Sequence, residues 1–578
     1  MKSATYILAC SELEKYGISA ELRLNEELPS FEISATGGKA VISAPDELEL
    51  LYGVYDFAER FGGWSFFEVG RDRFDASRKV TDLPDGILVK ATVPLIKRRG
   101  FIQEFPFDDE TGQLFDWMAK NKLNYLLVWM KYYDHLSDTL KEFARCRGIE
   151  IESGHHNFDY WIPGTVYGKT HPHFFAEIDG KRINPSGAGE LLLSEQLCTT
   201  NPELRAEIIR RMVEYCDAHP EVKTISLIPN DGFGWCECGN CSKFYDKDRK
   251  GDFYSVSQHV YRANEIYHDM LRNINRQLNA LRPDIKLTFC AYANYCSPSE
   301  NFALTPGLAV HMATYWRCIN HALDDPECRI NANYLRDIRN WCSVKKGGEV
   351  NIYEYFMGVN FYLSLPMIHW EKMFREFKWY HENNVDGVLT QFHISHWTVY
   401  GMNYRLMAKA GRGEDPEYSI RTMLADIFGE DAGEAEKFYR TIEKMMHDMG
   451  KCHIPYPRSI LRRTTAASFE QILELARALA AKAPQDNFRR ELVIWCEYLL
   501  RFKLLADKLF AQKATIEEVD DFVAWIHRHS GTRVFVHTKF DTYFSRVKQV
   551  IEAGKPWIHF DLDWEDKYVL AHDSFLNE

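Results

Sequence analysis

Between Pro94 and Trp397 the sequence alternates short apolar, strand-like segments with amphipathic helical ones, and this alternation constrains the fold more than any other feature. Eight strand-like segments can be counted, at residues 95–101, 125–130, 150–153, 224–229, 286–292, 309–315, 349–356 and 387–392. Helical segments separate most of them, but the connection after the fifth is short, so a helix is expected to be missing or reduced to a turn there. Eight strands in helical alternation predict an α/β fold, a closed parallel (β/α)8 barrel of the TIM type, over residues 91–403.

The regions on either side of the predicted barrel have different patterns. Residues 1–90 alternate strand-like runs at 6–9, 21–24, 31–34 and 40–43 with helical ones at 12–16 and 46–61, which predicts a small α/β domain. Residues 404–578 place apolar residues at helical spacing, for example through 469–480 and 491–510. We therefore predict a mostly helical C-terminal domain after the barrel.

Composition excludes several classes of partner. The formal net charge is -13, and the sequence contains no run of Lys or Arg that could form a local basic patch. Nucleic acid is therefore not an expected partner. No stretch approaches the roughly 20 apolar residues of a membrane span. The 14 cysteines are scattered, many in apolar contexts, and no secretory leader precedes them, which predicts free thiols and a cytoplasmic location. The oligomeric state is left open.

Common catalytic motifs are also absent from the sequence. It contains no GxGxxG, GxxxxGK[ST], HExxH or GxSxG segment. Dinucleotide chemistry, P-loop phosphoryl transfer, metalloprotease chemistry and esterase chemistry thus lose their usual sequence support.

Two acidic residues at predicted strand ends carry the chemistry that we expect. The fourth strand runs into IPNDGFGWCECGNC, so Asn230 and Asp231 leave it at the barrel mouth, although Asn-Asp-Gly is also common in turns. The seventh lies in EVNIYEYFMG, where Glu354 occupies an apolar strand and must be used, or paired with a core Arg such as Arg99. Strands four and seven lie across a barrel from each other, so their carboxyl groups can act together on a glycosidic bond. We predict Asp231 and Glu354 as the catalytic pair, with no cofactor required.

Groups suited to sugar binding follow other predicted strands. Apolar sugar faces stack on aromatic rings, and the fixed fork of an Arg can clamp hydroxyl groups or a carboxylate. Each ring alone is also explained by core packing, but rings after so many strands predict a shared aromatic cleft. The predicted substrate-binding residues are Arg99, Trp129, His155, Asn230, Tyr292, Tyr315, Trp316, His393 and Trp397.

The CxCxxC segment of Cys236, Cys238 and Cys241 has the most metal-like spacing in the chain. Closely spaced thiolates can share a tetrahedral zinc ion, and His259 or a distant cysteine could supply the fourth ligand. The alternative is a set of isolated structural thiols. Nothing nearby offers the open coordination position of a hydrolytic zinc, so any zinc here is expected to be structural.

With these residues in view, the sequence resembles glycoside hydrolase family 163, whose catalytic domain was long a domain of unknown function. The resemblance rests on IPNDGFGWCECGNC, on YEYF and on the small α/β domain before the barrel, and it covers residues 1 to about 400. It implies endo-acting β-N-acetylglucosaminidase activity, and the N-terminal domain is similar to those of hexosaminidases and α-glucuronidases. Hexosaminidases that use the substrate's acetamido group carry adjacent Asp and Glu after the fourth strand, whereas Asn230 and Asp231 stand here.

Three hypotheses follow. The first is a glycoside hydrolase that acts on an oligosaccharide or glycan, with a β-N-acetylhexosaminide as the candidate substrate. The second is a uronate-specific, α-glucuronidase-like enzyme in which Arg99 or Lys131 binds the carboxylate. The third is a carbohydrate-binding protein without catalytic activity.

Overall fold

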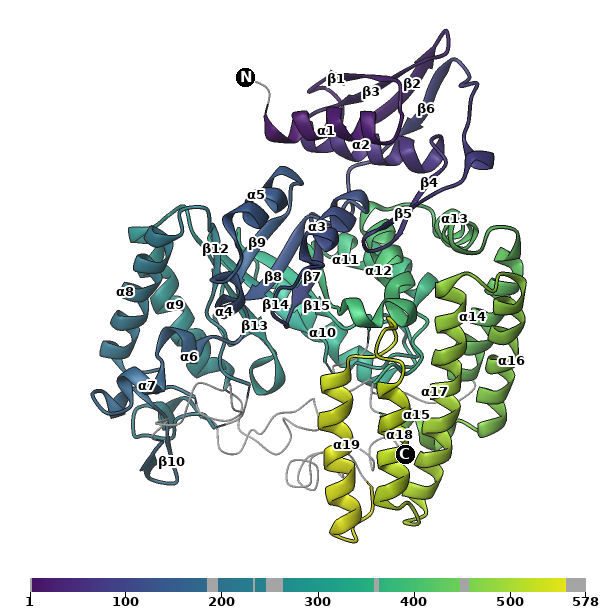
Figure 1. Ribbon diagram of the computed structural model, residues 1–578. Coiled ribbons are helices and arrows are strands. Elements are labelled where there is room, and N and C mark those ends of the chain that lie inside the picture. Colours follow the sequence, from purple (N-terminus) through teal and green to yellow (C-terminus); the bar gives the residue numbers. More distant parts are fainter. Residues whose placement is uncertain are drawn as a thin grey trace.

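The structure is a computed structural model that describes residues 3–183, 196–231, 234–245, 263–315, 317–357, 363–447 and 457–557. A region with a small sheet, a barrel and a set of long helices follow one another along the chain (Figure 1).

The N-terminal region packs two helices beside a four-stranded sheet of order β1-β3-β2-β6, in which only β1 and β3 are parallel. Its elements are α1 (Ala4–Lys15), β1 (Ala20–Leu24), β2 (Glu32–Thr36), β3 (Lys39–Ala44), α2 (Glu47–Arg60), β4 (Trp64–Glu68), β5 (Arg71–Phe74), η1 (Ala76–Arg78) and β6 (Gly86–Lys90). The strand predicted at residues 6–9 is wrong. Ser3 caps a helix there instead, since its hydroxyl accepts a hydrogen bond from the Tyr6 N–H at 3.2 Å.

Eight parallel strands form a closed barrel of order β12-β13-β14-β15-β16-β7-β8-β9, which confirms the predicted fold. They are β7 (Arg98–Gln103), β8 (Tyr125–Trp129), β9 (Glu150–Gly154), β12 (Thr224–Ser226), β13 (Lys286–Ala291), β14 (Leu308–Ala313), β15 (Glu349–Glu354) and β16 (Gly387–Gln391). Pairing of β16 with β7 closes the ring. The first strand begins and ends later than predicted, which changes the residues at its two ends.

Helices surround the barrel on its outer side (Figure 1). The helices and short elements between the strands are α3 (Thr111–Lys120), α4 (Met130–Tyr133), α5 (Asp138–Cys146), α6 (Phe158–Trp161), α7 (Gly164–Tyr167), η2 (Pro172–Phe174), β10 (Glu177–Ile178), β11 (Lys181–Arg182), α8 (Pro202–Ala218), η3 (Cys241–Phe244), α9 (Asn264–Leu281), η5 (Ala293–Tyr295), α10 (Arg329–Ser343), α11 (Trp370–Glu382) and η6 (Ile394–His396). Between β13 and β14 the described chain has only the turn η5, as the sequence predicted.

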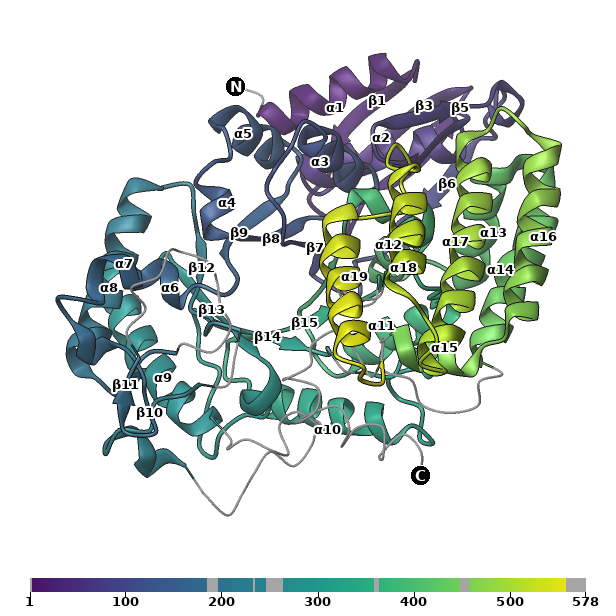
Figure 2. The same ribbon diagram turned by 60° about the horizontal axis from the view of Figure 1, so that its bottom comes forward.

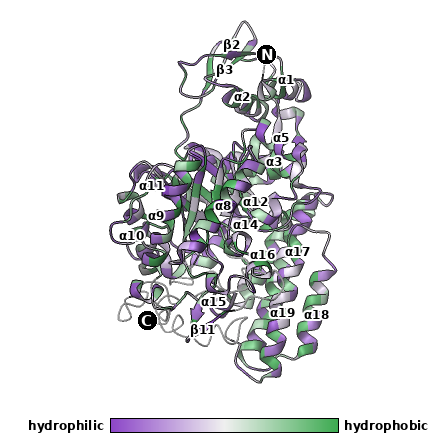
Figure 3. Cartoon of the chain, turned by 90° about the vertical axis from the view of Figure 1, so that its left-hand side faces the viewer, coloured by the Kyte–Doolittle hydropathy of each residue, from purple (hydrophilic) through white to green (hydrophobic). Residues whose placement is uncertain are grey.

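Side chains on the barrel strands alternate between two apolar cores, because successive residues of a strand point to opposite faces. Val350 and Ile352 of β15 join the large core between the strands and the helices. Tyr353 of the same strand joins a smaller cluster inside the barrel, with Leu127 and Cys290 from other strands. Figure 3 shows the apolar colour gathered on the barrel strands. The inner cluster forms the floor beneath the barrel mouth.

Long helices complete the chain and lie beside the barrel in both ribbon views (Figures 1 and 2). They are α12 (Trp397–Arg412), α13 (Pro416–Phe428), α14 (Ala432–His447), α15 (Pro457–Arg463), α16 (Ala466–Lys482), α17 (Asn487–Phe510), α18 (Ile516–His527) and α19 (His537–Glu552), with the turn η7 (Gly429–Asp431). Trp495 of α17 donates a hydrogen bond to the Ser364 carbonyl at 2.7 Å, which joins this region to the loop after β15. The domain boundaries at residues 90 and 403 stay predictions.

Within the described ranges, none of the helices combines the length and the apolar character that crossing a membrane requires.

Candidate functional site

A cavity of about 350 Å³ opens at the carboxyl ends of the barrel strands. Each of the eight strands contributes to its lining through its last residues or the turn that follows, and α19 adds Lys539. This volume lies in the range of small-molecule sites, and this end of a (β/α)8 barrel is where such enzymes place their catalytic groups.

Glu104, directly after β7, is the acceptor at the centre of a hydrogen-bond network on the cavity wall. Its Oε1 accepts hydrogen bonds from the Tyr353 hydroxyl at 2.8 Å and from the Gln391 side-chain amide. The Nε2 atom of His155 lies 3.1 Å from the same oxygen and 3.1 Å from the Tyr353 hydroxyl. Side chains from β15, β16 and the turn after β9 therefore hold this carboxylate in one orientation.

His155 adopts a backbone conformation that non-glycine residues rarely take, with φ at +70°. Its ring stacks on Trp129, with centroids 4.5 Å apart and planes 14° from parallel. Burial lowers the pKa of His155, although the hydrogen bond to Glu104 raises it, so the ring is neutral at neutral pH. Strained residues of this kind often cluster at functional sites.

Three polar atoms on the cavity lining have no hydrogen-bond partner among the described residues. They are His155 Nδ1, Trp129 Nε1 and Gln391 Oε1. Each of these atoms is buried, and buried polar groups normally find a partner, so the three mark an unusual polar environment directly behind the cavity surface.

Asp231 lies on the same cavity, in the turn after β12, and its side chain is exposed. Burial raises the pKa of the Tyr292 hydroxyl, and the Asp231 charge beside it raises that pKa further. Asn230 does not line the cavity, in contrast to the prediction. Its Oδ1 accepts a hydrogen bond from the Asp159 N–H at 3.3 Å and its carbonyl accepts one from Gln196 Nε2 at 2.6 Å, so Asn230 fixes the turn that carries Asp231.

Tyrosine rings form one wall of the cavity. The ring centroids of Tyr292 and Tyr315, two predicted residues, lie 5.9 Å apart with the rings edge to face. The ring centroids of Tyr315 and Tyr355 lie 5.3 Å apart. The ring centroids of Tyr353 and Tyr355 lie 5.0 Å apart. With Trp129, which was also predicted, these rings give the cavity the aromatic surface on which sugar faces stack.

Glu354 does not face this cavity, and the prediction that it opposes Asp231 is wrong. Its neighbours Tyr353 and Tyr355 take the inward positions of β15, so its own side chain points toward α11. There Glu354 accepts hydrogen bonds from Tyr380 at 2.6 Å and from Arg317 at 2.7 Å, and it is fully buried. Glu354 therefore forms a buried ion pair, which was the alternative to a catalytic role, and its partner is Arg317 instead of Arg99.

Other predicted binding residues lie elsewhere. Because β7 begins at Arg98, Arg99 lies at the amino end of the strand, where its guanidinium donates to the carbonyls of Ile96 and Lys122. Trp397 is buried, and its Nε1 donates to the Phe67 carbonyl at 3.0 Å. The same residue lines a second hollow rather than the cavity at the barrel mouth.

His393 is also outside the cavity lining, and its ring packs edge to face on Phe105 with centroids 4.4 Å apart. Burial lowers the pKa of His393 to about 4. Trp316 lies outside the described residues.

The predicted site residues did not include several groups that line the cavity, among them Glu104, Tyr353, Tyr355, Gln391 and Lys539. Alternation along β15 places the two tyrosines on one face and Glu354 on the other, but it does not indicate which face is inward. Glu104 follows Gln103, the last residue of β7, and a predicted strand end two residues later would have placed Glu104 at the barrel mouth. No local signal indicates Lys539, which comes from α19.

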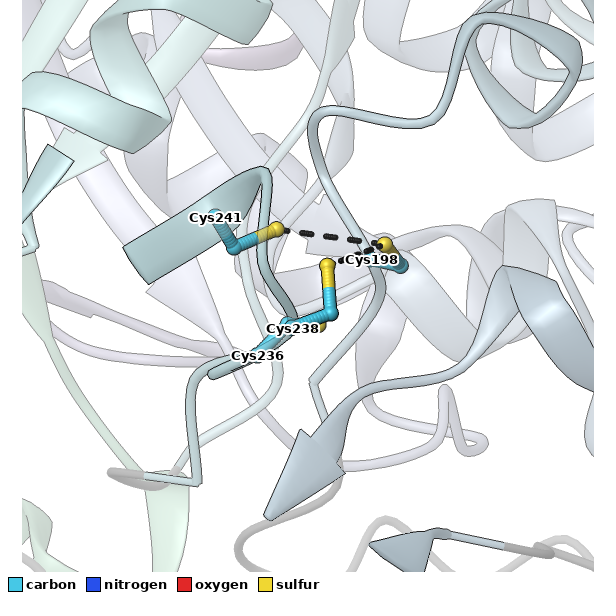
Figure 4. A group of neighbouring side chains, drawn as sticks. All are labelled: Cys198, Cys236, Cys238 and Cys241. Atoms are coloured by element: carbon cyan, nitrogen blue, oxygen red, sulfur yellow. Dashed lines mark hydrogen bonds between the residues drawn. The ribbon is translucent and has the colours of Figure 1, made fainter. Parts of the chain in front are cut away.

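The cysteine segment after β12 gains a fourth member in space. The sulfur atoms of Cys198, Cys236, Cys238 and Cys241 all lie within 4.8 Å of one another (Figure 4). Cys198 precedes α8, so a distant cysteine completes the group, while His259 lies outside the described residues.

Comparison with known families now identifies the relatives of this chain. A family described as a domain of unknown function (DUF4838) matches residues 84–440, which is more than half of the chain. The chain belongs to the DUF4838 family. The matched range contains every strand of the barrel and all of the cavity-lining residues of the DUF4838 protein except Lys539. No curated protein matches its sequence.

Among solved structures, the DUF4838 protein is similar to glycoside hydrolases. A family 89 enzyme from Clostridium perfringens, in complex with its substrate GlcNAc-alpha-1,4-galactose, matches with a TM-score of 0.57 and 11% identity, over 99% of this chain and 74% of the other. A GH138 enzyme targeting pectin rhamnogalacturonan II matches with a TM-score of 0.52 and 10% identity, over 95% of this chain and 78% of that enzyme. At these identities the likeness demonstrates a shared fold.

Proposed function

We propose that the protein is a glycoside hydrolase that cleaves an O-glycosidic bond of a carbohydrate bound at the barrel mouth. One observation carries the proposal: two carboxylates, Glu104 and Asp231, line a single aromatic cavity at the carboxyl ends of the strands. Hydrolysis of a glycosidic bond needs such a pair of carboxyl groups. The fold shared with family 89 and GH138 hydrolases supports the same proposal.

Glu104 replaces Glu354 in the proposed catalytic pair, beside Asp231. Because hydrogen bonds from Tyr353 and Gln391 fix its Oε1, Glu104 suits the role that needs a stationary carboxylate, which attacks the anomeric carbon or activates water. Asp231 is exposed and can exchange protons with water between turnovers. We therefore assign to Asp231 the protonation of the departing oxygen.

His155 and Trp129 are proposed to position the sugar. The neutral His155 ring can donate from Nε2 to Glu104 and so hold that carboxylate toward the substrate. Trp129 and Tyr315 offer ring surfaces on the cavity. These contacts orient the glycosidic bond between the two carboxylates.

Among substrates, we favour an oligosaccharide that contains N-acetylhexosamine, as the resemblance to glycoside hydrolase family 163 implies, with cleavage in the cytoplasm. A uronate-containing substrate is the second candidate. Arg99 cannot bind its carboxylate, since that guanidinium is buried at the far end of β7, but Lys539 is a basic residue on the cavity lining. Preference between hexosaminides and glucuronides, and its change in Lys539→Met, separates these candidates.

The decisive experiment compares Glu104→Gln and Asp231→Asn with the unchanged protein on a panel of aryl glycosides and N-glycans. Removing a general acid or base typically lowers kcat by about 10²–10⁴-fold. We expect losses of that size in both variants, with melting temperatures close to that of the unchanged protein. Glu354→Gln is the matched control, because it removes a carboxylate that does not line the cavity.

Turnover that is unchanged in both Glu104→Gln and Asp231→Asn would remove these residues from the chemistry. If the unchanged protein is stabilised by sugars and releases no product across the panel, it is a carbohydrate-binding protein instead.

A further inference from the structure

Four cysteine sulfurs converge beside the turn that carries Asp231 (Figure 4). Cys198 Sγ lies 3.7 Å from Cys238 Sγ and 3.8 Å from Cys241 Sγ, and Cys236 Sγ is within 4.8 Å of all three. Four thiolates around a tetrahedral zinc ion, each with a Zn–S bond of about 2.3 Å, lie about 3.8 Å from one another. The two measured separations thus match the edge of a zinc tetrathiolate.

The surroundings of these sulfurs suit thiolates rather than thiols. The Glu177 N–H donates to Cys236 Sγ at 3.3 Å, and the Thr200 hydroxyl lies 3.0 Å from Cys241 Sγ. The guanidinium of Arg182 lies 3.9 Å from Cys236 Sγ, where its positive charge offsets part of the negative charge of a tetrathiolate. Donors of this kind around the ligands orient them and raise metal affinity.

Neither disulfides nor isolated thiols explain the arrangement as well. A disulfide requires sulfur atoms about 2.05 Å apart, and all four cysteines are free. Buried thiols that act as small hydrophobes have no reason to converge four at a time, since packing is not directional. A shared ion gives that convergence a physical cause.

We propose that Cys198, Cys236, Cys238 and Cys241 bind one zinc ion with a structural role. Four protein ligands close the tetrahedron and leave no position for water, so the ion does not take part in hydrolysis. Each thiol releases its proton as the metal binds, and the resulting Zn–S bonds join the segment before α8 to the loop after β12.

The ion also connects to the catalytic turn through Gln196, two residues before Cys198. Gln196 Nε2 donates to the Asn230 carbonyl at 2.6 Å, and Asn230 is adjacent to Asp231. The Glu237 N–H donates to the Glu177 carbonyl at 2.7 Å, which fixes the other side of the loop. Zinc therefore positions Asp231, and this second part of the inference rests on the proposed function.

Metal content tests the zinc site without any substrate. We expect the full-length protein, purified without chelator, to hold zinc by mass spectrometry, and Cys198→Ser and Cys238→Ser each to lose one equivalent per chain. Cys216→Ser is the matched control, since Cys216 is also buried but lies in α8 outside the group. Replacement of zinc by Co²⁺ should give thiolate-to-cobalt charge-transfer absorption in the unchanged protein and in Cys216→Ser. The same absorption should be absent from Cys198→Ser and Cys238→Ser.

If the serine variants do not fold, the unchanged protein still decides the question. A mercurial that titrates its thiols should release one equivalent of zinc, detected by a chromogenic chelator. A protein that holds no metal after growth with added zinc, or whose variants keep the full equivalent, would overturn the proposal. For the positioning role, metal removal should lower kcat more than it raises KM, and equal kcat with and without zinc would refute that role alone.

Discussion

Arg317 is the cation that two buried carboxylates share. Its Nη1 lies 2.7 Å from Glu354 Oε1 and 3.2 Å from Glu376 Oε2, and Nη2 bonds the second oxygen of Glu376. All three side chains are almost completely removed from solvent. Burial raises the pKa of Glu376, but the charges of Arg317 and His369 outweigh this effect and hold that pKa below its ordinary value. Replacement by methionine in Arg317→Met keeps an unbranched apolar side chain similar to the aliphatic part of arginine and removes the charge.

The expected cost follows from this geometry. Breaking a buried ion pair by removing one partner costs about 3–5 kcal/mol, and here two carboxylates lose their partner, so this range is a lower limit. At about 2.1 cal/mol/K per residue, cooperative unfolding of 578 residues carries an entropy of about 1.2 kcal/mol/K. The melting temperature of Arg317→Met should therefore fall by at least about 2.5–4 °C, and by more if the barrel unfolds on its own.

Thermal unfolding at several pH values measures this effect. Removal of the Arg317 charge raises the pKa of Glu376 from its lowered value, because burial then dominates. The loss of stability in Arg317→Met is therefore largest at neutral pH and becomes smaller as pH falls through that raised pKa. The double variant Arg317→Met/Glu354→Gln should melt above Arg317→Met, because one unpaired charge is gone and Glu376 keeps His369 at 3.0 Å. Equal melting temperatures for Arg317→Met and the unchanged protein, or a deficit that widens in acid, would refute the reasoning.

Three further predictions concern packing, acid stability and binding. A Cβ at Gly100 would lie 1.6 Å from the Tyr125 carbonyl oxygen, so Gly100→Ala should prevent soluble expression, whereas Gly112→Ala, with 3.6 Å to its nearest atom, should melt like the unchanged protein. Burial lowers the pKa of His268 to about 3, so the folded ring stays neutral while the unfolded one is protonated below about 6.5, and stability is lost as pH falls through that value. This difference is about 2 kcal/mol at pH 5, and His268→Gln should show a correspondingly smaller drop in melting temperature between pH 7 and pH 5. Trp129→Ala should raise the KM for any substrate by up to about tenfold in steady-state kinetics, since it removes a stacking ring, and an unchanged KM would place the sugar elsewhere.

The barrel could be predicted from the sequence because buried parallel strands give nearly continuous apolar segments between amphipathic helices. Its first strand shows the limit of that reading. Arg98 and Arg99 look like a polar strand end, yet Arg98 pairs with Glu349 and Arg99 bonds backbone carbonyls, so both are buried at the beginning of the strand. The predicted strand began three residues and ended two residues too early, so Arg99 was predicted at the mouth and Glu104 was missed.

Glu354 and Cys198 could not be assigned from local sequence for different reasons. In β15 apolar and aromatic residues occupy both alternating faces, so the sequence does not indicate which face points to the barrel axis. Asp231, in contrast, follows a strand and points into the mouth whichever face is inward. Cys198 lies 38 positions before Cys236, and only folding of the intervening α8 brings the two together. Spacing rules detect ligands on one loop, not across a crossover connection.

The contribution of Lys539 to the cavity has a consequence for how the protein is made. The residues that line the cavity range from Glu104 to Lys539, an interval of 435 positions. At translation rates of about 5–20 residues per second, roughly 20 to 90 s pass on the ribosome between the emergence of the first and the last of these side chains. A chain that ends before α19 lacks Lys539 on the cavity wall, so the binding site is complete only after almost the whole chain has been synthesised.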